Sequence, residues 1–318
     1  MNKVLSIMGT DILPGKTTTL NLDIARLHTH AKIEIPVIVD RGKEDGPNLL
    51  LMAGIHGNEL NGVEIVRSLI ASHHTRPKCG TVISIPVINV FGFLNQSREF
   101  PDGKDLNRSF PGSKLGSLAS IFAYHLMKEI LPCADYCIDF HTGGANRFNS
   151  SQIRIEKDNT DLLELSAIFN PRFIVYTPDR DKSFRKTATR EGKKILLFEG
   201  GKSLDFNQRI TERGKYGVLK IMHHLGMRDF AQELEQFHYE NSILIQKSAW
   251  LRARYGGLFR FSVKDGAKVS KGQLIGSISD PYGKFEHLVK IPYDGYIIGL
   301  NHSPIVYQGD ALVHLGTV

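Results

Sequence analysis

The residues with the clearest chemical potential are His56 and Glu59, which follow an apolar run at residues 49–55 and open a helical pattern at residues 59–70. This order predicts a buried strand, a tight turn and a helix, with the imidazole and the carboxylate on the turn. The two side chains can share one Zn²⁺, because such nitrogen and oxygen ligands lie about 2.0–2.2 Å from the metal. Alone, the pair is weak evidence, since a surface pair beside a helix N-terminus is the commoner explanation.

A third metal ligand is predicted at His141, which ends the apolar run 136–140 and precedes Thr-Gly-Gly. Three protein ligands with one open position are typical of a catalytic zinc site. Asp139 lies two residues earlier and faces the same side of a strand, so its carboxylate is expected to orient the imidazole. Taken alone, His141 is also compatible with an ordinary hydrogen-bonded turn histidine.

A polar loop at residues 95–112 contains Arg98, Asn107 and Arg108 between proline and glycine residues. Metals do not use arginine as a ligand. A guanidinium beside an amide suits two-point recognition of a substrate carboxylate, with Arg98 as a second cation. The alternative is a solvated loop with ordinary surface charges.

Glu199 ends a further apolar run at residues 195–198 and is followed by two glycines. A charged residue at the end of a buried strand is a candidate for a functional role, although a salt-bridged strand end is the alternative. A carboxylate near a metal can take a proton from water and pass it to a leaving amine. Like His56, Glu59 and His141, Glu199 falls at the edge where open α/β sheets bind ligands.

Taken together, these residues resemble the aspartoacylase and succinylglutamate desuccinylase family, a branch of the zinc carboxypeptidase superfamily. The resemblance runs from about residue 30 to the C-terminus. The third ligand follows the first by 85 residues (141 minus 56), which is similar to the acyl-amino-acid branch. The motifs that carry it are His-Gly-Asn-Glu at 56–59, Asp-Leu-Asn-Arg at 105–108, Phe-His-Thr-Gly at 140–143 and Phe-Glu-Gly-Gly at 198–201.

This resemblance implies a zinc-dependent amidohydrolase that cleaves the amide bond of a small N-acyl amino acid. One Zn²⁺ per chain would be bound by His56, Glu59 and His141 and would lower the pKa of its bound water to about 7. Glu199 would accept the proton of that water and then protonate the departing amine.

The resemblance also implies roles for the cations. Arg98 would stabilise the charge that develops on the carbonyl oxygen. Asn107 and Arg108 would hold the substrate carboxylate, and Arg190 would bind a second anionic group. Arg185 competes with Arg190 for that last role, because the intervening sequence matches the family poorly.

Two other functions stay open. A carboxypeptidase that trims peptide C-termini would use the same zinc, the same glutamate and the same Asn-Arg pair. A small closed pocket would favour the acyl amino acid and an open groove the peptide, and the C-terminal barrel and the loop at residues 143–151 could close such a pocket. A non-catalytic binding protein on the same fold is disfavoured, because all four residues of the site are present.

The pattern from about residue 48 to 226 alternates apolar strands with helices, which predicts an α/β fold with a mostly parallel, helix-covered sheet. The resemblance implies a mixed, zinc-carboxypeptidase-like sheet with helices on both faces. A strand at residues 33–39 is expected at an edge because of Pro36, and residues 227–246 suggest a connecting helix. Strands are expected near 48–54, 81–88, 135–140, 172–176 and 194–198, and helices near 59–72, 117–131, 159–168 and 207–225.

The C-terminal part contains an internal repeat, in which residues 255–275 are echoed by 293–312 with offsets of 38 (295 minus 257) and 37 (309 minus 272). Two such halves predict a small β barrel or sandwich similar to the biotinyl/lipoyl-carrier fold. Lys284 lies near the position of the modified lysine of true carriers, but the usual Met-Lys neighbourhood is absent. We therefore predict a hydrolase domain at 1–246 and a β domain at 247–318 that shapes the active site or mediates assembly into a homo-oligomer.

Composition limits the partners and the compartment. The 318 residues carry a formal net charge of +7, which favours anionic partners. Lysine and arginine are spread without a basic run, so a small anionic substrate is expected rather than nucleic acid. Residues 1–8 lack the apolar region of a signal peptide, and no run approaches the roughly 20 apolar residues of a membrane span. Three cysteines do not suggest a disulfide framework, and a cytoplasmic location is expected.

Overall fold

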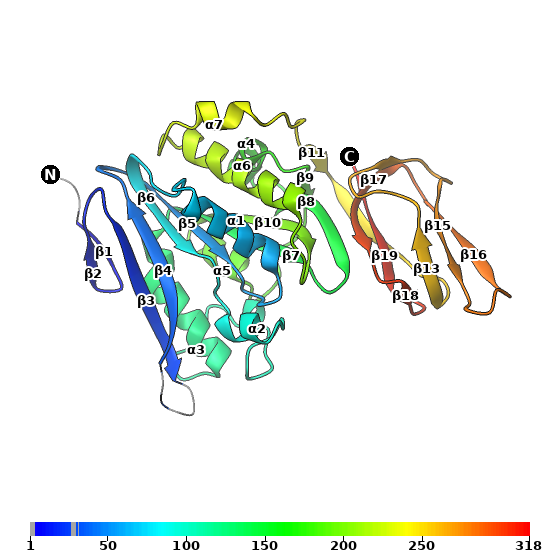
Figure 1. Ribbon diagram of the computed structural model, residues 1–318, viewed down its shortest axis with the longest axis horizontal. Helices are drawn as coiled ribbons and strands as arrows, with labels where there is room; N and C mark the ends of the chain where they lie inside the picture. The colour runs from blue at the N-terminus through cyan, green and yellow to red at the C-terminus, as the bar shows by residue number, and fades with distance from the viewer. Residues whose placement is uncertain (1–3, 27–29, 31) are drawn as a thin grey trace.

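The computed structural model describes residues 4–26, 30 and 32–318. Its centre is a mixed sheet of 13 strands, whose main path runs β12-β19-β17-β8-β10-β7-β5-β6-β4-β3 (Figure 1). Two short hairpin strands, β1 (Leu5–Ile7) and β2 (Thr10–Ile12), lie outside this sheet. The strands of the sheet are β3 (Thr17–Arg26), β4 (Lys32–Arg41), β5 (Glu44–Ala53), β6 (Cys79–Ile85), β7 (Tyr136–Gly143), β8 (Arg147–Ile155), β9 (Phe173–Tyr176), β10 (Lys194–Lys202), β11 (Ile243–Ile245), β12 (Lys247–Arg252), β14 (Lys268–Val269), β17 (Gly295–Asn301) and β19 (Ala311–Thr317).

The mixed sheet is confirmed, but the sheet as a whole is not mostly parallel. Parallel pairing joins β6, β5, β7 and β10 in the centre and β8, β9 and β11 at one side. The other ladders, including β10 with β8 and β8 with β17, are antiparallel. The prediction erred because strand-helix alternation describes only the central strands.

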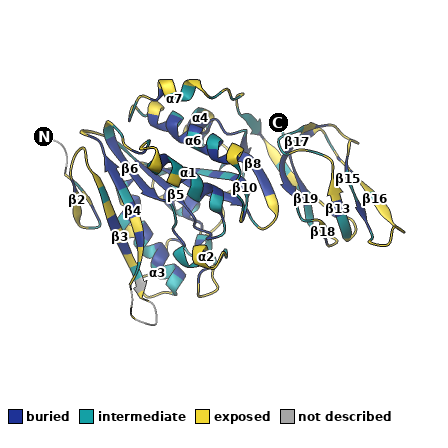
Figure 2. Ribbon diagram, viewed as in Figure 1, coloured by how far each residue is buried: buried dark blue, intermediate teal, exposed yellow. Residues whose placement is uncertain are grey.

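Helices cover both faces of the sheet, as expected. Strand β5 shows the two faces: Leu50 and Met52 belong to one hydrophobic cluster, and Leu49 and Leu51 belong to the other. The central strands are therefore buried on both sides (Figure 2). The first cluster contains residues of α3 (Leu118–His125) and α5 (Phe184–Arg190), and the second contains residues of α1 (Leu60–Ala71), α4 (Thr160–Phe169) and α6 (Gln208–His224).

Three expectations need correction. Pro36 does not mark an edge strand, because β4 lies between β3 and β6. The pairing of β4 with β6 begins only at Ile38, so Pro36 lies outside that ladder. Residues 227–246 form only the short helix α7 (Ala231–Glu235) before β11. The helix expected at 117–131 ends as α3 at His125 and continues as a wider turn and a 3-10 turn to Cys133. A short helix, α2 (Val90–Leu94), follows β6.

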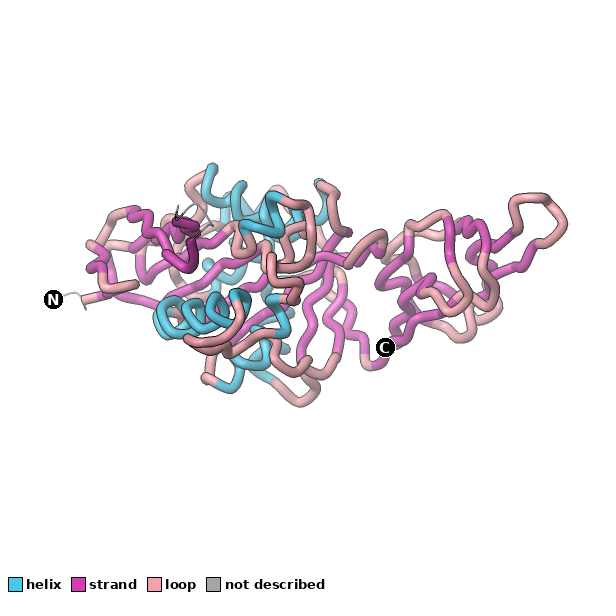
Figure 3. The backbone as a smooth tube through the Cα atoms, turned by 90° about the horizontal axis from the view of Figure 1, so that it is seen from below, coloured by secondary structure: helices cyan, strands magenta, loops and turns pink. Residues whose placement is uncertain are grey.

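The C-terminal part is all-β, as predicted, and lies at one end of an elongated molecule (Figure 3). A sheet of β13 (Gly257–Phe261), β15 (Leu274–Ser279), β16 (Glu286–Lys290) and β18 (Ile305–Val306) packs with β17 and β19 around a separate hydrophobic cluster. Strands β12, β17 and β19 also belong to the large sheet, through the pairing of β17 with β8. The division at residue 246 stays a prediction. In the described residues, no helix is long and apolar enough to cross a membrane.

Candidate active site

His56 and Glu59 lie on the turn between β5 and α1, as the sequence predicts. The chain turns sharply after β5, where Gly54 has a φ of +68°. Gly57 packs against the backbone of α2 so closely that a Cβ would lie 1.8 Å from the carbonyl carbon of Gly92. The absence of a side chain at Gly57 therefore allows the turn to pack against α2, and His56 and Glu59 on this turn are buried.

His56, Glu59 and His141 converge in the interior, with exposed fractions of only 2%, 2% and 4%. His56 Nδ1 lies 2.8 Å from Glu59 Oε1, and His141 Nδ1 lies 3.0 Å from Glu59 Oε2. One ligand atom from each side chain can be chosen so that all lie within 4.8 Å of one another. Residues 85 positions apart thus form one group that could hold a metal.

A carboxylate orients each imidazole from its other nitrogen. His141 Nε2 lies 3.0 Å from Asp139 Oδ2, as expected from their spacing along β7. His56 Nε2 lies 3.1 Å from Asp105 Oδ1. Such partners fix the tautomer and direct the free nitrogen toward a metal. This role of Asp105 was not predicted from the sequence. The sequence feature that could have revealed it is the position of Asp105 in the same motif as Asn107 and Arg108.

The surroundings of His56 Nδ1 indicate that these three residues fit a zinc ion. His56 Nδ1 is buried and makes no geometrically acceptable hydrogen bond with any described residue, although a Glu59 oxygen is 2.8 Å away. A buried nitrogen without a hydrogen-bond partner is costly unless it has another ligand. Two nitrogens and one carboxylate are the donor set that zinc prefers.

The charges of the group are strongly coupled. Burial by itself would raise the pKa of Glu59, but His56 and His141 outweigh it and hold that pKa well below its usual range. Burial would likewise lower the pKa of His141, but the carboxylates of Asp139 and Glu59 raise it well above its usual value. The Glu59 carboxylate is therefore held in its ionised form.

Arg98 lies against this group. Its Nη1 is 3.2 Å from Glu59 Oε1, and its Nη2 is 2.9 Å from Asp105 Oδ2. Its side chain is 37% exposed, so one side remains open to the cavity. The structure thus brings a cation next to the three metal-ligating candidates, where the resemblance implied it.

Glu199 lies on β10 and is held by two residues of β8 that sequence reasoning missed. Asn149 Nδ2 donates to Glu199 Oε2 at 2.8 Å, and Arg154 Nη1 lies 3.2 Å from Glu199 Oε1. Five positions apart, they would face opposite sides of a regular strand. The register of β8 against β10 slips by one residue between Gln152 and Asn149, which brings both to the same face.

Residues 147–151 of the loop expected at 143–151 belong to strand β8, and Gly143, Gly144, Ala145 and Arg147 line the cavity. An apolar run does not mark this strand, because Asn149, Ser150, Ser151 and Gln152 are polar. All four are buried. The neighbouring strands β10 and β17 satisfy the backbone of β8, which is a tertiary effect.

Asn107 and Arg108 line the same cavity. They lie in the short 3-10 turn Leu106–Arg108, where the Asn107 N–H donates to Asp105 Oδ1 at 2.8 Å. Asn107 Oδ1 accepts from the N–H of Phe184, and Arg108 Nη1 donates to the Asn107 carbonyl at 2.5 Å. Burial lowers the pKa of Arg108, and the guanidinium stays charged.

Arg190 is the one predicted site residue that the structure does not bring to the cavity. It is exposed at the end of α5 and is not among the described residues that line the space. Arg185, five residues earlier on the helix, does line it. Arg185 is already paired with Asp179 and with the carbonyls of Arg154 and Pro178. Five residues turn a helix by about 140° beyond one full turn, which separates the two arginines.

The cavity that joins these groups has a volume of about 840 Å³ and is strongly cationic. Three residues of the C-terminal strands, Ser248, Trp250 and His314, form part of its wall. Its acidic side chains are Glu59, Asp179 and Glu199, and its arginines are Arg98, Arg108, Arg147, Arg154, Arg180 and Arg185.

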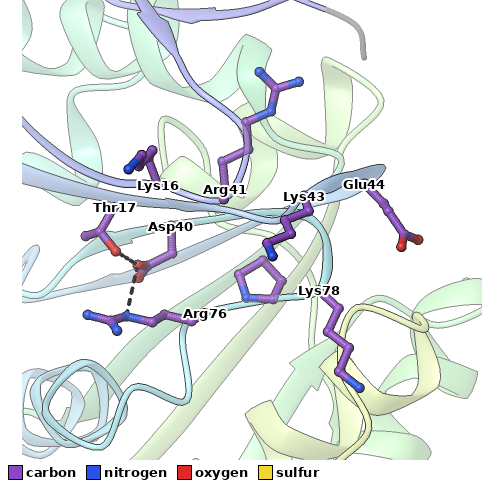
Figure 4. A pocket seen from close by; sticks show the side chains of 10 residues that line it. Lys16, Thr17, Asp40, Arg41, Lys43, Glu44, Arg76 and Lys78 are labelled. Carbon is purple, nitrogen blue, oxygen red and sulfur yellow. Dashed lines mark hydrogen bonds and ion pairs between the residues drawn. The ribbon is translucent and has the colours of Figure 1, made fainter. Parts of the chain in front are cut away.

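A second cavity of about 510 Å³ lies at the opposite edge of the sheet, where β5 and β6 begin (Figure 4). Its buried carboxylate, Asp40, accepts a hydrogen bond from Thr17 Oγ1 and lies 3.9 Å from Arg76 Nε. The side chain of Lys78 extends away from that pair. Among the described residues, the group of His, Cys, Asp or Glu that could hold a metal is His56, Glu59 and His141, so we place the candidate active site there.

The model of the succinylglutamate desuccinylase/aspartoacylase catalytic domain matches residues 45–225, more than half of the chain. The chain belongs to this family. The matched segment contains all three metal-ligating candidates and Glu199, so the family resemblance inferred from the four motifs is confirmed.

The chain is similar to one curated protein in sequence and to solved structures in fold. The N-alpha-acetyl-L-2,4-diaminobutyric acid deacetylase of Halomonas elongata is 28% identical over 260 residues, covering 78% of this chain and 75% of its own. The fold is shared with a succinylglutamate desuccinylase/aspartoacylase from Rhodobacter sphaeroides (TM-score 0.81, 24% identity, 94% of this chain and 95% of that one). It is also shared with the product-bound ectoine utilization protein EutE (DoeB) from Ruegeria pomeroyi (TM-score 0.81, 22% identity, 96% and 98%).

Proposed function

We propose that this protein is a zinc-dependent amidohydrolase that removes the acyl group from a small, anionic N-acyl amino acid. The observation that carries the proposal is the meeting of His56, Glu59, His141 and Glu199 at one arginine-lined cavity. A zinc ion held by the first three would polarise the amide carbonyl and acidify water. We propose one zinc ion per chain, in a cytoplasmic enzyme.

Glu199 is the general base and acid of this mechanism. Its carboxylate takes a proton from water as the water oxygen adds to the amide carbonyl carbon. It then returns that proton to the amine nitrogen when the C–N bond breaks, so that a free carboxylic acid and a free amino acid result. Asn149 and Arg154 hold the carboxylate in place through both of its oxygens.

The arginines bind and position the substrate. Arg108, with Asn107 beside it, holds the α-carboxylate by two-point recognition. Arg98 places positive charge next to Glu59, where the carbonyl oxygen gains negative charge. We propose that Arg185 or Arg180, rather than Arg190, binds a second anionic group of the substrate, because both line the cavity.

We further propose that residues 247–318 form a biotinyl/lipoyl-like barrel, distinct from the hydrolase domain at 1–246. A separate hydrophobic cluster within the C-terminal part supports this division. Assembly into a homo-oligomer stays a prediction.

The direct test is turnover of a panel of N-acetyl and N-succinyl amino acids by zinc-loaded and metal-stripped protein. We expect hydrolysis that requires the metal and the free α-carboxylate. Peptides with a free C-terminal carboxylate, included in the same panel, test the alternative carboxypeptidase function. Hydrolysis of the peptides in preference to every acyl amino acid would contradict the proposal, and so would activity that survives metal removal.

A further inference from the structure

The C-terminal strands contribute two stacked rings to the cavity. We propose that Trp250 and His314 form the wall against which the acyl group lies, and that they select a short, uncharged acyl group. This inference rests on the proposed deacylase function. It assigns to the C-terminal strands a part in the choice of substrate.

The two rings form one rigid surface. Trp250 on β12 and His314 on β19 lie directly opposite each other in an antiparallel ladder. Their ring centroids are 4.6 Å apart and their planes differ by only 8°. Ser248, two residues before Trp250, faces the same side, and all three line the cavity that contains Glu199. Two stacked rings bury area with little conformational freedom, so they make a firm wall.

This wall is tied to the catalytic carboxylate through one row of the sheet. His314 lies opposite Gly299 on β17, and Gly299 lies opposite Asn149 on β8. The Asn149 amide in turn donates to Glu199 at 2.8 Å. A Cβ at Gly299 would lie 3.1 Å from Asn149 Oδ1 and 3.2 Å from His314 Cβ, so the glycine lets these side chains approach. The wall is therefore held at a fixed distance from Glu199.

The wall lies where an acyl chain would extend. In the sheet, the metal-ligating strand ends belong to β5 and β7, followed by β10 with Glu199, β8 with Asn149, and then β17, β19 and β12. For a carbonyl bound between the metal-ligating candidates and Glu199, we place the acyl substituent along this direction, toward Trp250 and His314. The amino acid is held by its carboxylate at Arg108, on a loop that follows β6.

The chemistry of the wall favours an uncharged group. His314 is 8% exposed, and its Nδ1 has no hydrogen-bond partner among the described residues. Burial, assisted by the charge of Arg154, lowers the pKa of His314 to about 3, so the ring is neutral at pH 7. Arg154 is itself engaged by Glu199. At this wall, a second carboxylate on the acyl group would meet two neutral rings and a guanidinium that already pairs with Glu199, whereas a methyl or ethyl group can pack against the rings.

The first test compares kcat/KM for N-acetyl, N-propionyl, N-butyryl and N-succinyl forms of the best amino acid. We expect the parent to prefer acetyl or propionyl over succinyl. Trp250→Ala should raise kcat/KM for the N-butyryl substrate relative to the N-acetyl substrate by about tenfold or more. This is the scale on which a pocket discriminates substrates that differ by one or two methylenes. Trp250→Phe, which keeps a ring, should retain the order of the parent.

A second series of N-acetyl derivatives of different amino acids is the control, and its order should not change in Trp250→Ala. The assignment would be overturned if Trp250→Ala changed the order of preference among amino acids but not among acyl groups. An equal loss of kcat/KM on every substrate would also overturn it. A parent with no activity on any acyl amino acid would instead refute the proposed function itself.

Fluorescence gives a readout that does not depend on turnover, because Trp250 is the only tryptophan of the chain. An N-acetyl substrate titrated into zinc-loaded Glu199→Gln protein should change the emission saturably. The midpoint should equal the Kd from calorimetry on the same protein. Binding by calorimetry without any change in emission would remove Trp250 from the substrate wall.

Discussion

Asn149 donates its side-chain amide to Glu199 at 2.8 Å, across the boundary between an antiparallel and a parallel part of the sheet. Strand β10 pairs with parallel β7, which carries His141, and with antiparallel β8, which carries Asn149. The candidate base is thus fixed between the strand that carries the metal-ligating candidate His141 and a strand that joins the C-terminal part.

This contact predicts that Asn149 positions the base. Asn149→Ala should lower kcat/KM by about 10–100-fold, since a hydrogen bond to a charged group contributes about 1.5–3 kcal/mol. Zinc content should not change. In a Glu199→Gln background the same substitution should have little further effect, and a double-mutant cycle measures this. Equal losses in both backgrounds would make Asn149 merely structural.

Metal content separates the ligands from the base. His56→Ala should lose both zinc and activity, because it removes one of three ligands. Glu199→Gln should keep zinc and fold but lose about 10²–10⁴-fold in rate. His74→Ala, at a histidine outside the cavity, is the matched control and should keep both properties. Elemental analysis that finds full zinc in His56→Ala would exclude His56 as a ligand.

Asp139 should tune the affinity for the metal without binding it. Because its carboxylate fixes His141 from Nε2, Asp139→Asn should weaken zinc binding by about 10–100-fold. Competition with a chelator measures this affinity. An unchanged affinity would show that the geometry of His141 does not depend on this contact.

The Arg108 guanidinium should distinguish substrates that carry an α-carboxylate. Arg108→Lys should lower kcat/KM for such substrates, with a loss of transition-state stabilisation of about 1.5–3 kcal/mol. The reason is that lysine cannot reproduce two-point binding. The corresponding substrate amide, which binds poorly to either enzyme, should be little affected. Arg190→Lys, at an exposed position off the cavity, should change neither. Equal losses on both substrates would assign Arg108 to structure.

His314 should make stability depend on pH. Its folded pKa of about 3 lies below the ordinary value of 6.5, so between these values the unfolded chain binds more protons. The free energy of unfolding should therefore fall as the pH drops from 7 toward 4, by at most about 1.4 kcal/mol per pH unit from this group. Urea unfolding of the parent and of His314→Phe, which cannot titrate, isolates the effect. Parallel pH profiles for the two proteins would contradict it.

The sequence by itself determined the parts of the site that local patterns encode. Apolar runs that end in His56, His141 and Glu199 predicted three strand ends of β5, β7 and β10, because a buried central strand needs such a run and a glycine turn must follow it. The spacing of Asp139 and His141 along one strand likewise predicted their contact. These features depend on neighbours in the chain.

Only the tertiary structure decided which distant residues join them. Strand β8 is polar, and its burial depends on β10 and β17, so neither Asn149 nor Arg154 was foreseen. The helix rotation that separates Arg185 from Arg190 decided which arginine lines the cavity. Trp250 reaches the site because β12 and β19 extend the large sheet. Strand order and register are set by long-range pairing, which no local pattern specifies.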